Sequence, residues 1–147
     1  MNWRQLRRAQ REICQLGTYR KGRVGETMLK LNVENIGDLA IVECEGRIVQ
    51  SESAFKLRDV VTSQSDARTV VIELTEVRAI EGGGLGMLVF LQRWARDHNI
   101  RLKLFNPSKS VRERLTLVSP LAKFDIPTLD EMMGLLGQAD SQYAIAA

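Results

Sequence analysis

Hydrophobic and polar residues alternate regularly from Leu29 onward, and their spacing predicts alternating strands and helices. The predicted strands cover 29–33, 39–45, 69–74 and 100–105, and the predicted helices follow Ser51, cover 83–97, follow Ser108 and begin near Thr128. Residues 35–38 have a turn-forming composition that can join the first two strands as a hairpin. Ser51 is expected to cap its helix, Thr128 and Glu131 form a capping box, and Gly137 is expected to end the last helix.

The faces of the predicted strands differ in polarity. Strands that alternate with helices are expected to be parallel and joined by right-handed crossovers. One face gathers apolar residues, namely Val42, Cys44, Val70, Ile72, Leu74, Ile100, Leu102 and Leu104. The other would carry Glu43, Glu45, Glu73, Arg101 and Lys103, whose charges we expect to pair across strands. The sequence therefore predicts an α/β fold with a mostly parallel four- to five-stranded sheet and helices mainly on one face.

The charge of the chain is concentrated at its start. Residues 1–28 hold seven basic and two acidic side chains, whereas the rest of the chain is mildly acidic. This distribution argues against nucleic acid as a partner of the core domain. We expect a basic N-terminal extension over 1–28, one domain over 29–136 and a C-terminal tail over 137–147. The extension has the pattern of a short amphipathic helix that could bind an anionic membrane surface or nucleic acid. The alternatives are a loosely ordered segment and a translated leader upstream of a true start at Met28.

The composition limits which kinds of membrane segment, metal site and cofactor site the chain can contain. The chain has no apolar stretch of the ~20 residues that span a bilayer and no pattern of a signal peptide, so we expect a cytoplasmic protein. Two cysteines and one histidine predict neither a disulfide framework nor a metal site, and no cofactor is expected. His98 is expected to cap a helix or lie on the surface. The apolar residues Met87, Leu88, Phe90, Leu91 and Trp94 are expected in the core, with Met87 the most exposed.

The most informative stretch is a glycine-rich turn between a strand and a helix. Glu73-Leu74-Thr75 ends a β-branched strand, and Glu81-Gly82-Gly83-Gly84-Leu85-Gly86 opens the next helix. This resembles the STAS domain, which has Asp-Leu-Ser and Asp-Ser-Ser-Gly-Leu-Gly in those places. Three further stretches agree, namely Glu45-Gly46-Arg47, Leu104-Phe105-Asn106-Pro107-Ser108 and Phe124-Asp125-Ile126-Pro127. The resemblance covers about residues 29–136 and implies the fold of anti-sigma factor antagonists.

The glycine turn departs from that pattern at the residue that the family uses as a switch. In phosphorylatable relatives the second serine of the motif is modified by a kinase-type anti-sigma factor, and here Gly83 stands in its place. Because Gly83 has no hydroxyl, phosphorylation at this position is excluded. Thr75 and Ser51 are alternative phosphoacceptors. Glu81, in place of aspartate, keeps a carboxylate near the positive end of the helix dipole.

The resemblance implies a non-enzymatic module that binds a protein partner, namely an anti-sigma factor antagonist-like regulator that acts without phosphorylation at the usual serine position. The residues expected to contact an anti-sigma factor or another signalling protein are Arg47, Glu81, Gly82, Gly83, Gly84 and Met87. Alternatives are an accessory subunit of a lipid-transporting ATPase complex and a nucleotide-binding module. The sequence also leaves open whether the protein forms a homodimer. The glycines have a structural alternative as well, in which they only permit a tight turn or close packing.

Overall fold

The computed structural model of the chain describes residues 29–49 and 51–146. The basic extension and the amphipathic helix expected within residues 1–28 lie outside the described residues. Within the described part, no helix combines the length and the apolar character that a membrane span requires.

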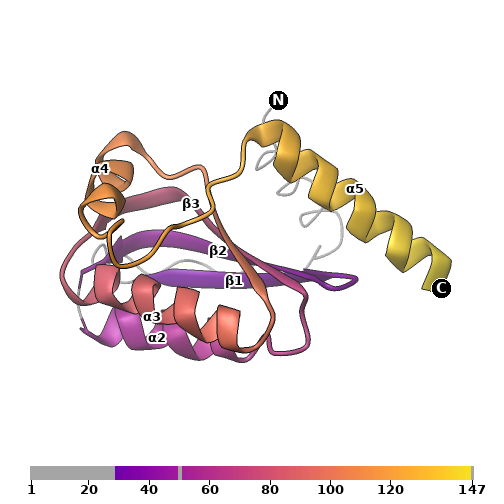
Figure 1. Cartoon of the computed structure of the whole chain (residues 1–147), viewed down its shortest axis with the longest axis horizontal. Helices are drawn as coiled ribbons and strands as arrows, with labels where there is room; N and C mark the ends of the chain where they lie inside the picture. Colours follow the sequence, from indigo (N-terminus) through magenta and orange to yellow (C-terminus); the bar gives the residue numbers. More distant parts are fainter. Residues whose placement is uncertain (1–28, 50, 147) are drawn as a thin grey trace, which may run out of the picture.

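Four strands form a single sheet in the order β1-β2-β3-β4 (Figure 1). They are β1 (Lys30–Ile36), β2 (Leu39–Ile48), β3 (Thr69–Ile80) and β4 (Arg101–Phe105). β1 and β2 are an antiparallel hairpin, and β2, β3 and β4 are parallel to one another. The predicted hairpin and the mostly parallel sheet are confirmed.

β3 is longer than the sequence predicts. The expected strand stops at Leu74, but β3 continues to Ile80 and keeps pairing with the end of β2, where Ile48 pairs with Ile80. Two register shifts in β2 accompany this extension. Val77 and Ile80 are buried, so the residues expected as a loose connection are a part of the core.

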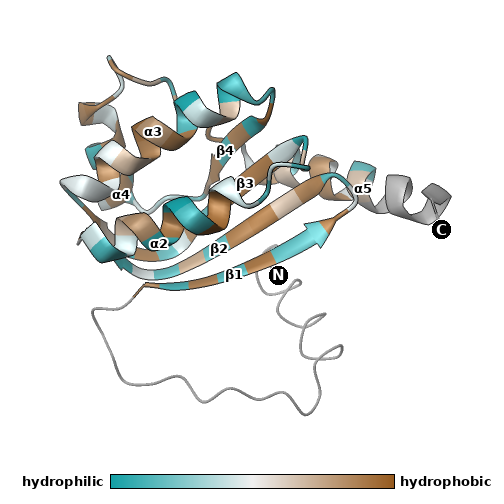
Figure 2. Ribbon diagram, turned by 90° about the horizontal axis from the view of Figure 1, so that it is seen from below, coloured by the Kyte–Doolittle hydropathy of each residue, from teal (hydrophilic) through white to brown (hydrophobic). Residues whose placement is uncertain are grey.

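The described residues form four helices: α2 (Ser51–Thr62), α3 (Gly83–Asp97), α4 (Lys109–Leu117) and α5 (Leu129–Ala146). α2 and α3 lie side by side over one face of the sheet, where α2 contacts β1 and β2 and α3 contacts β4 (Figure 2). α4 packs against β3 through Val111 and Leu115, which belong to the same core. The apolar sheet face predicted from the sequence lies in this core.

α5 lies on the opposite face of the sheet, where it forms a second, smaller core. Met132, Leu136 and Ala139 of α5 pack with apolar residues of the sheet, namely Leu39, Ile41, Val71 and Phe105. The predicted arrangement with helices mainly on one face is therefore confirmed for α2, α3 and α4, which share the main core, and α5 is the exception. The sequence pattern did not predict a helix on this face, because only the first residues of β2 and β3 are apolar there.

The polar residues of the second face do not pair as expected. Glu43 and Glu73 are neighbours in the parallel register of β2 and β3, and both are buried. Glu43 accepts a hydrogen bond from Asn32 Nδ2, and Glu73 accepts one from the backbone N–H of Thr75. Lys103 pairs with Asp125, which follows α4, rather than with a glutamate of the sheet.

Two of the predicted helix ends, at Ser108 and Thr128, follow the capping chemistry in the sequence, whereas those at Ser51 and Gly137 do not. Ser108 accepts a hydrogen bond from Val111 N, and Thr128 and Glu131 exchange two hydrogen bonds at the start of α5. The prediction that Gly137 ends the last helix is wrong, because α5 continues to Ala146. Ala139, two residues beyond the glycine, is buried, so packing of α5 on the sheet overrides the weak helix propensity of glycine.

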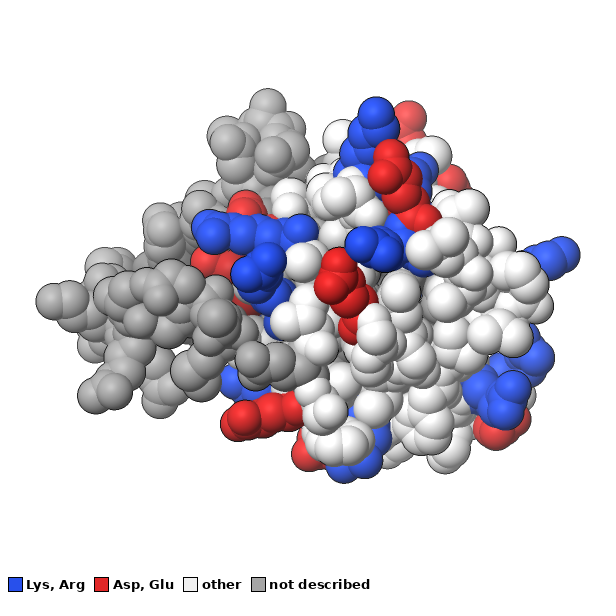
Figure 3. Space-filling model, turned by 90° about the vertical axis from the view of Figure 1, so that its left-hand side faces the viewer, with Lys and Arg blue, Asp and Glu red and all other residues white. Residues whose placement is uncertain are grey.

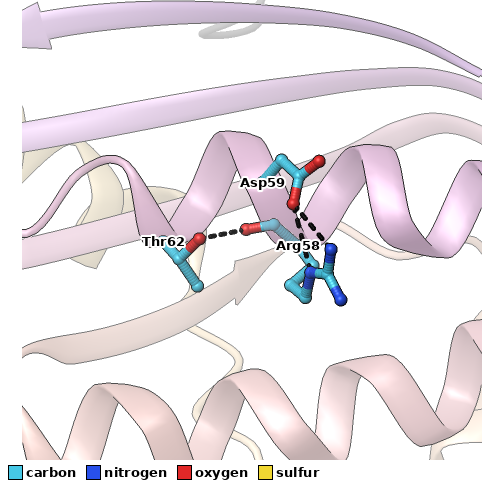
Figure 4. Close-up of polar contacts among 3 residues, drawn as sticks. All are labelled: Arg58, Asp59 and Thr62. Atoms are coloured by element: carbon cyan, nitrogen blue, oxygen red, sulfur yellow. Dashed lines mark hydrogen bonds and ion pairs between the residues drawn. The ribbon is translucent and has the colours of Figure 1, made fainter.

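The prediction that Ser51 caps α2 is wrong, because α2 begins at Ser51 itself and the serine is the first residue of the helix rather than the residue before it. Its buried side carries Ala54, Leu57 and Val61, as the spacing predicts. On the outer side, Arg58 donates from Nε and Nη2 to Asp59 Oδ1, and Thr62 Oγ1 donates to the carbonyl oxygen of Arg58 at 2.7 Å (Figure 4). These contacts are local to the helix surface.

Candidate protein-docking site at the glycine corner

The turn between β3 and α3, which we call the glycine corner, consists of residues 81–84. Its first amide, Glu81 N, donates to the carbonyl oxygen of Ile48 at the end of β2, at 3.3 Å. Gly82 has φ +52° and ψ −115°, a conformation that side chains on an L-residue exclude. Gly84 N then donates to Glu81 O at 2.9 Å and closes the turn. The corner is therefore a fixed backbone feature that requires glycine at position 82.

Gly84 is needed for a different reason, which is close packing. It is buried, and a Cβ atom placed on it would lie 2.1 Å from the backbone oxygen of Ile48 and 2.9 Å from Ile48 Cγ2. No side chain fits in this space without moving α3 away from β2. At position 84, glycine is therefore required for close packing, which was the alternative to a role in binding. Gly84 shapes the corner but is not part of its surface.

Gly83 differs from both neighbours. It is exposed as the first residue of α3, and a Cβ atom built on it meets nothing within 4 Å. Its backbone does not have the positive φ that Gly82 has. Neither the conformation nor the packing requires glycine here. The absence of a side chain at position 83 leaves the first turn of α3 accessible without affecting how the chain folds.

Glu81 is tied to α4 across the corner. Arg114 Nη2 donates to Glu81 Oε1 at 3.0 Å, and both side chains are about half exposed. An exposed pair of this kind stabilises by less than about 1 kcal/mol. Its effect is to fix the direction of the carboxylate, which is held toward α4 at the edge of the corner. Sequence reasoning did not find Arg114, because 33 residues separate it from its partner.

The side chains around the corner are partly those predicted. Arg47 is exposed near the end of β2, where it pairs in register with Ala79 of β3. Met87 is half-buried, and Phe90 is 48% exposed. The expectation that Met87 would be the exposed member of the α3 apolar group is therefore wrong, and Phe90 takes that place. Positions 83, 87 and 90 have the spacing of one helix face, which is the signal that could have found Phe90.

We give the name corner surface to six residues, of which Met87 is half-buried and the others are exposed: Arg47, Glu81, Gly82, Gly83, Met87 and Phe90. It lies at the end of the molecule where β2 and β3 finish, which Figure 3 views directly. On this end, white areas without charged side chains lie beside small groups of basic and acidic residues.

The two alternative phosphoacceptors occupy different environments. Thr75 is half-buried, and its Oγ1 accepts a hydrogen bond from Asn106 Nδ2 at 3.1 Å. Ser51 is exposed at the start of α2, three residues after Ile48. Of the two hydroxyls, that of Ser51 is the more accessible to another macromolecule.

The other candidate residues take structural positions. His98 is exposed at the C-terminal end of α3, where Nδ1 lies 2.8 Å from the carbonyl oxygen of Trp94 and the ring stacks on the Trp94 indole. It therefore caps the helix as predicted. In the described part of the chain, no three His, Cys, Asp or Glu side chains are grouped so that they could hold a metal ion.

Comparison with solved structures gives the same fold. An anti-sigma factor antagonist from Mycobacterium paratuberculosis matches with a TM-score of 0.63 and 18% identity, over 75% of this chain and 95% of that one. SpoIIAA, an anti-sigma factor antagonist, matches in its unphosphorylated form with a TM-score of 0.61 and 14% identity, over 74% of this chain and 97% of that one. The phosphorylated Bacillus protein matches with a TM-score of 0.57 and 14% identity, over 73% and 99%.

No curated protein matches the chain by sequence. The sequence profile of the STAS domain, in contrast, matches residues 30–131. This range contains the whole sheet, α2, α3 and α4 and the start of α5, and it agrees with the resemblance carried by the glycine turn. The chain belongs to the STAS domain family.

Proposed function

We propose that this protein is an anti-sigma factor antagonist-like regulator whose corner surface binds a protein partner, a kinase-type anti-sigma factor. The observation that carries the proposal is the exposure of the corner: Glu81, Gly82 and Gly83 are all open to solvent on a rigid turn. Rigid sites lose little conformational entropy when a partner binds. The solved structures that share the fold include anti-sigma factor antagonists, which supports this class of partner.

The proposed partner would contact a surface with an apolar centre. Phe90 and Met87 supply apolar area beside the bare backbone at Gly82 and Gly83, and Arg47 supplies a charge at the rim. Aromatic side chains and methionine are enriched at the centres of interfaces, and a truncated aromatic anchor commonly costs more than about 2 kcal/mol of binding free energy. The proposal therefore expects Phe90 to dominate the affinity.

Regulation would not use phosphorylation of the corner, because Gly83 has no oxygen to modify. Thr75 is half-buried and its Oγ1 accepts a hydrogen bond from Asn106, which limits the access of a kinase to this hydroxyl. The amount of the protein, or competition with another partner, would set how much anti-sigma factor is bound. The protein would then be an antagonist that is always competent to bind.

A binding assay with a matched pair of variants tests the docking site. An anti-sigma factor kinase encoded in the same genome is titrated against the wild type, Gly83→Glu and Ser65→Glu by calorimetry. The glutamate at 83 fits in open space and lies at a helix N-terminus, where a negative charge stabilises the fold. We expect at least about tenfold weaker binding for Gly83→Glu and wild-type binding for Ser65→Glu, which adds the same charge in the exposed loop after α2.

Equal affinity for all three proteins would contradict the proposed docking site. Incubation of the wild type with the same kinase and ATP, followed by mass spectrometry, tests the regulation. We expect no incorporated phosphate. Efficient modification of Ser51 or Thr75 would overturn the claim that the protein acts without phosphorylation.

A further inference from the structure

A pocket of about 520 Å³ lies at the end of the sheet opposite the glycine corner. Its walls come from the turn before β2, the starts of β3 and β4, and α5, which Figure 1 shows on that side of the molecule. The lining residues are Asp38, Leu39, Arg68, Thr69, Asn99, Arg101, Leu135, Gln138 and Ala139. The pocket is separated from the corner by the length of β3, roughly 40 Å at ~3.3 Å per residue. It is therefore independent of the proposed docking surface.

Backbone hydrogen bonds fix the positions of two arginines that line this pocket, Arg68 and Arg101. Asp38 O accepts hydrogen bonds from Arg68 N at 2.8 Å and from Thr69 N at 3.3 Å, which fixes the start of β3 against the β1–β2 turn. Arg101 N donates to Arg68 O at 2.9 Å, which fixes the start of β4 beside it. The positions from which Arg68 and Arg101 project are thus set by strand pairing rather than by a loop.

The two guanidinium groups are weakly engaged by the protein. Arg68 Nε lies 3.7 Å from Asp38 Oδ2, the single acidic group of the lining, and the Arg68 side chain is 84% exposed. Arg101 has no ion-pair partner among residues 29–49 and 51–146. The carbonyl oxygens near the end of α3 do not need the arginines as hydrogen-bond donors. They already accept hydrogen bonds from His98 N, Asn99 N and Ile100 N.

The rest of the lining completes a site for a small organic anion. Guanidinium groups bind carboxylates and phosphates through two parallel hydrogen bonds. The amide side chains of Asn99 and Gln138 add donors, while Leu39, Leu135 and Ala139 give one wall that is apolar. The volume lies within the range of small-molecule sites, about 300–1,000 Å³. We propose that this pocket binds a small organic anion through its carboxylate or phosphate group, held by Arg68 and Arg101.

Such a ligand would connect α5 to the sheet, because α5 supplies three of the lining residues, Leu135, Gln138 and Ala139. Without a ligand, α5 is held by the small second core. A bound anion adds contacts on both sides of the pocket, so it would lower the rate at which α5 amides exchange with solvent. This gives a readout that is separate from binding of a protein partner and from the proposed function.

The experiment titrates the full chain with citrate and, separately, with inorganic pyrophosphate at constant ionic strength, using calorimetry. We expect one saturable site with a dissociation constant near or below about 1 mM for at least one of the two anions. Binding of citrate would indicate a carboxylate ligand, and binding of pyrophosphate would indicate a phosphate ligand. Arg101→Gln should weaken binding about tenfold, and the double variant Arg68→Gln/Arg101→Gln should abolish it. Arg93→Gln, which removes an exposed arginine of α3 outside the pocket, should bind as the wild type does.

Hydrogen exchange on the same samples completes the test. The anion that binds should slow exchange in residues 132–139 of the wild type and of Arg93→Gln, and not in the double variant. Circular dichroism checks that each variant is folded. The proposal is overturned if neither anion gives saturable binding up to about 10 mM, or if the double variant binds as tightly as the wild type.

Discussion

Two adjacent glycines of the corner should respond in opposite directions to the same substitution. Gly84→Ala places a Cβ atom 2.1 Å from the backbone oxygen of Ile48, although real Cβ atoms essentially never approach another atom within 3.0 Å. The start of α3 must therefore move by about 1 Å from the end of β2. Because the obstructing atom belongs to the backbone of a paired strand, a side-chain rotation cannot relieve the contact.

The magnitude follows from two opposing effects. Overpacking of a buried site costs about 1–3 kcal/mol, and the better helix propensity of alanine returns at most about 1 kcal/mol. Gly84→Ala should therefore destabilise the fold by about 1–2 kcal/mol. Gly83→Ala meets no atom within 4 Å and keeps only the favourable effect, so it should stabilise the fold by about 0.4–1 kcal/mol.

Urea unfolding followed by circular dichroism measures both variants against the wild type. The reasoning requires a lower midpoint for Gly84→Ala and an equal or higher midpoint for Gly83→Ala, with unchanged m-values. Loss of stability in Gly83→Ala as large as that in Gly84→Ala would refute it, because position 83 would then not be the open position described here.

Three further substitutions address the site and the fold. Gly83→Ser restores a hydroxyl in open space, so an anti-sigma factor kinase that binds the protein should phosphorylate it there, as mass spectrometry would detect, while the wild type stays unmodified at the corner. Phe90→Ala should weaken partner binding at least about tenfold while lowering the free energy of unfolding by less than about 1 kcal/mol, since the ring is half exposed; a large loss of stability would assign it to the core instead. Thr128→Ala removes the hydrogen bond to Glu131 N and should destabilise the start of α5 by about 1 kcal/mol, seen as faster amide exchange in residues 129–132; unchanged exchange there would show that packing alone fixes this helix.

Local patterns in the sequence were sufficient for most elements of the fold. The bounds predicted for α3 are those observed, because an apolar residue recurs at helical spacing between Gly83 and Asp97. The capping box at Thr128 also formed as predicted. The helix end expected at Gly137 failed because glycine is a weak signal, and contacts between α5 and the sheet outweigh it.

Long-range contacts account for what the sequence did not reveal at the site. Three consecutive glycines look alike in the sequence, yet Gly82 is required by its backbone angles, Gly84 by the approach of Ile48, and Gly83 by neither. Only the packing of α3 against β2 distinguishes them. In the same way, the pairing of Arg114 with Glu81 depends on how α4 packs beside the corner, and no local pattern predicts it.

The claim that the corner is a docking surface is tested most directly by hydrogen exchange on the protein with and without the anti-sigma factor. The account predicts that amides in residues 82–90 exchange more slowly in the complex, while those in residues 63–69 at the other end of the sheet are unchanged. Protection confined to β1 or α5, with the amides of Gly82, Gly83 and Met87 exchanging as in the free protein, would contradict it.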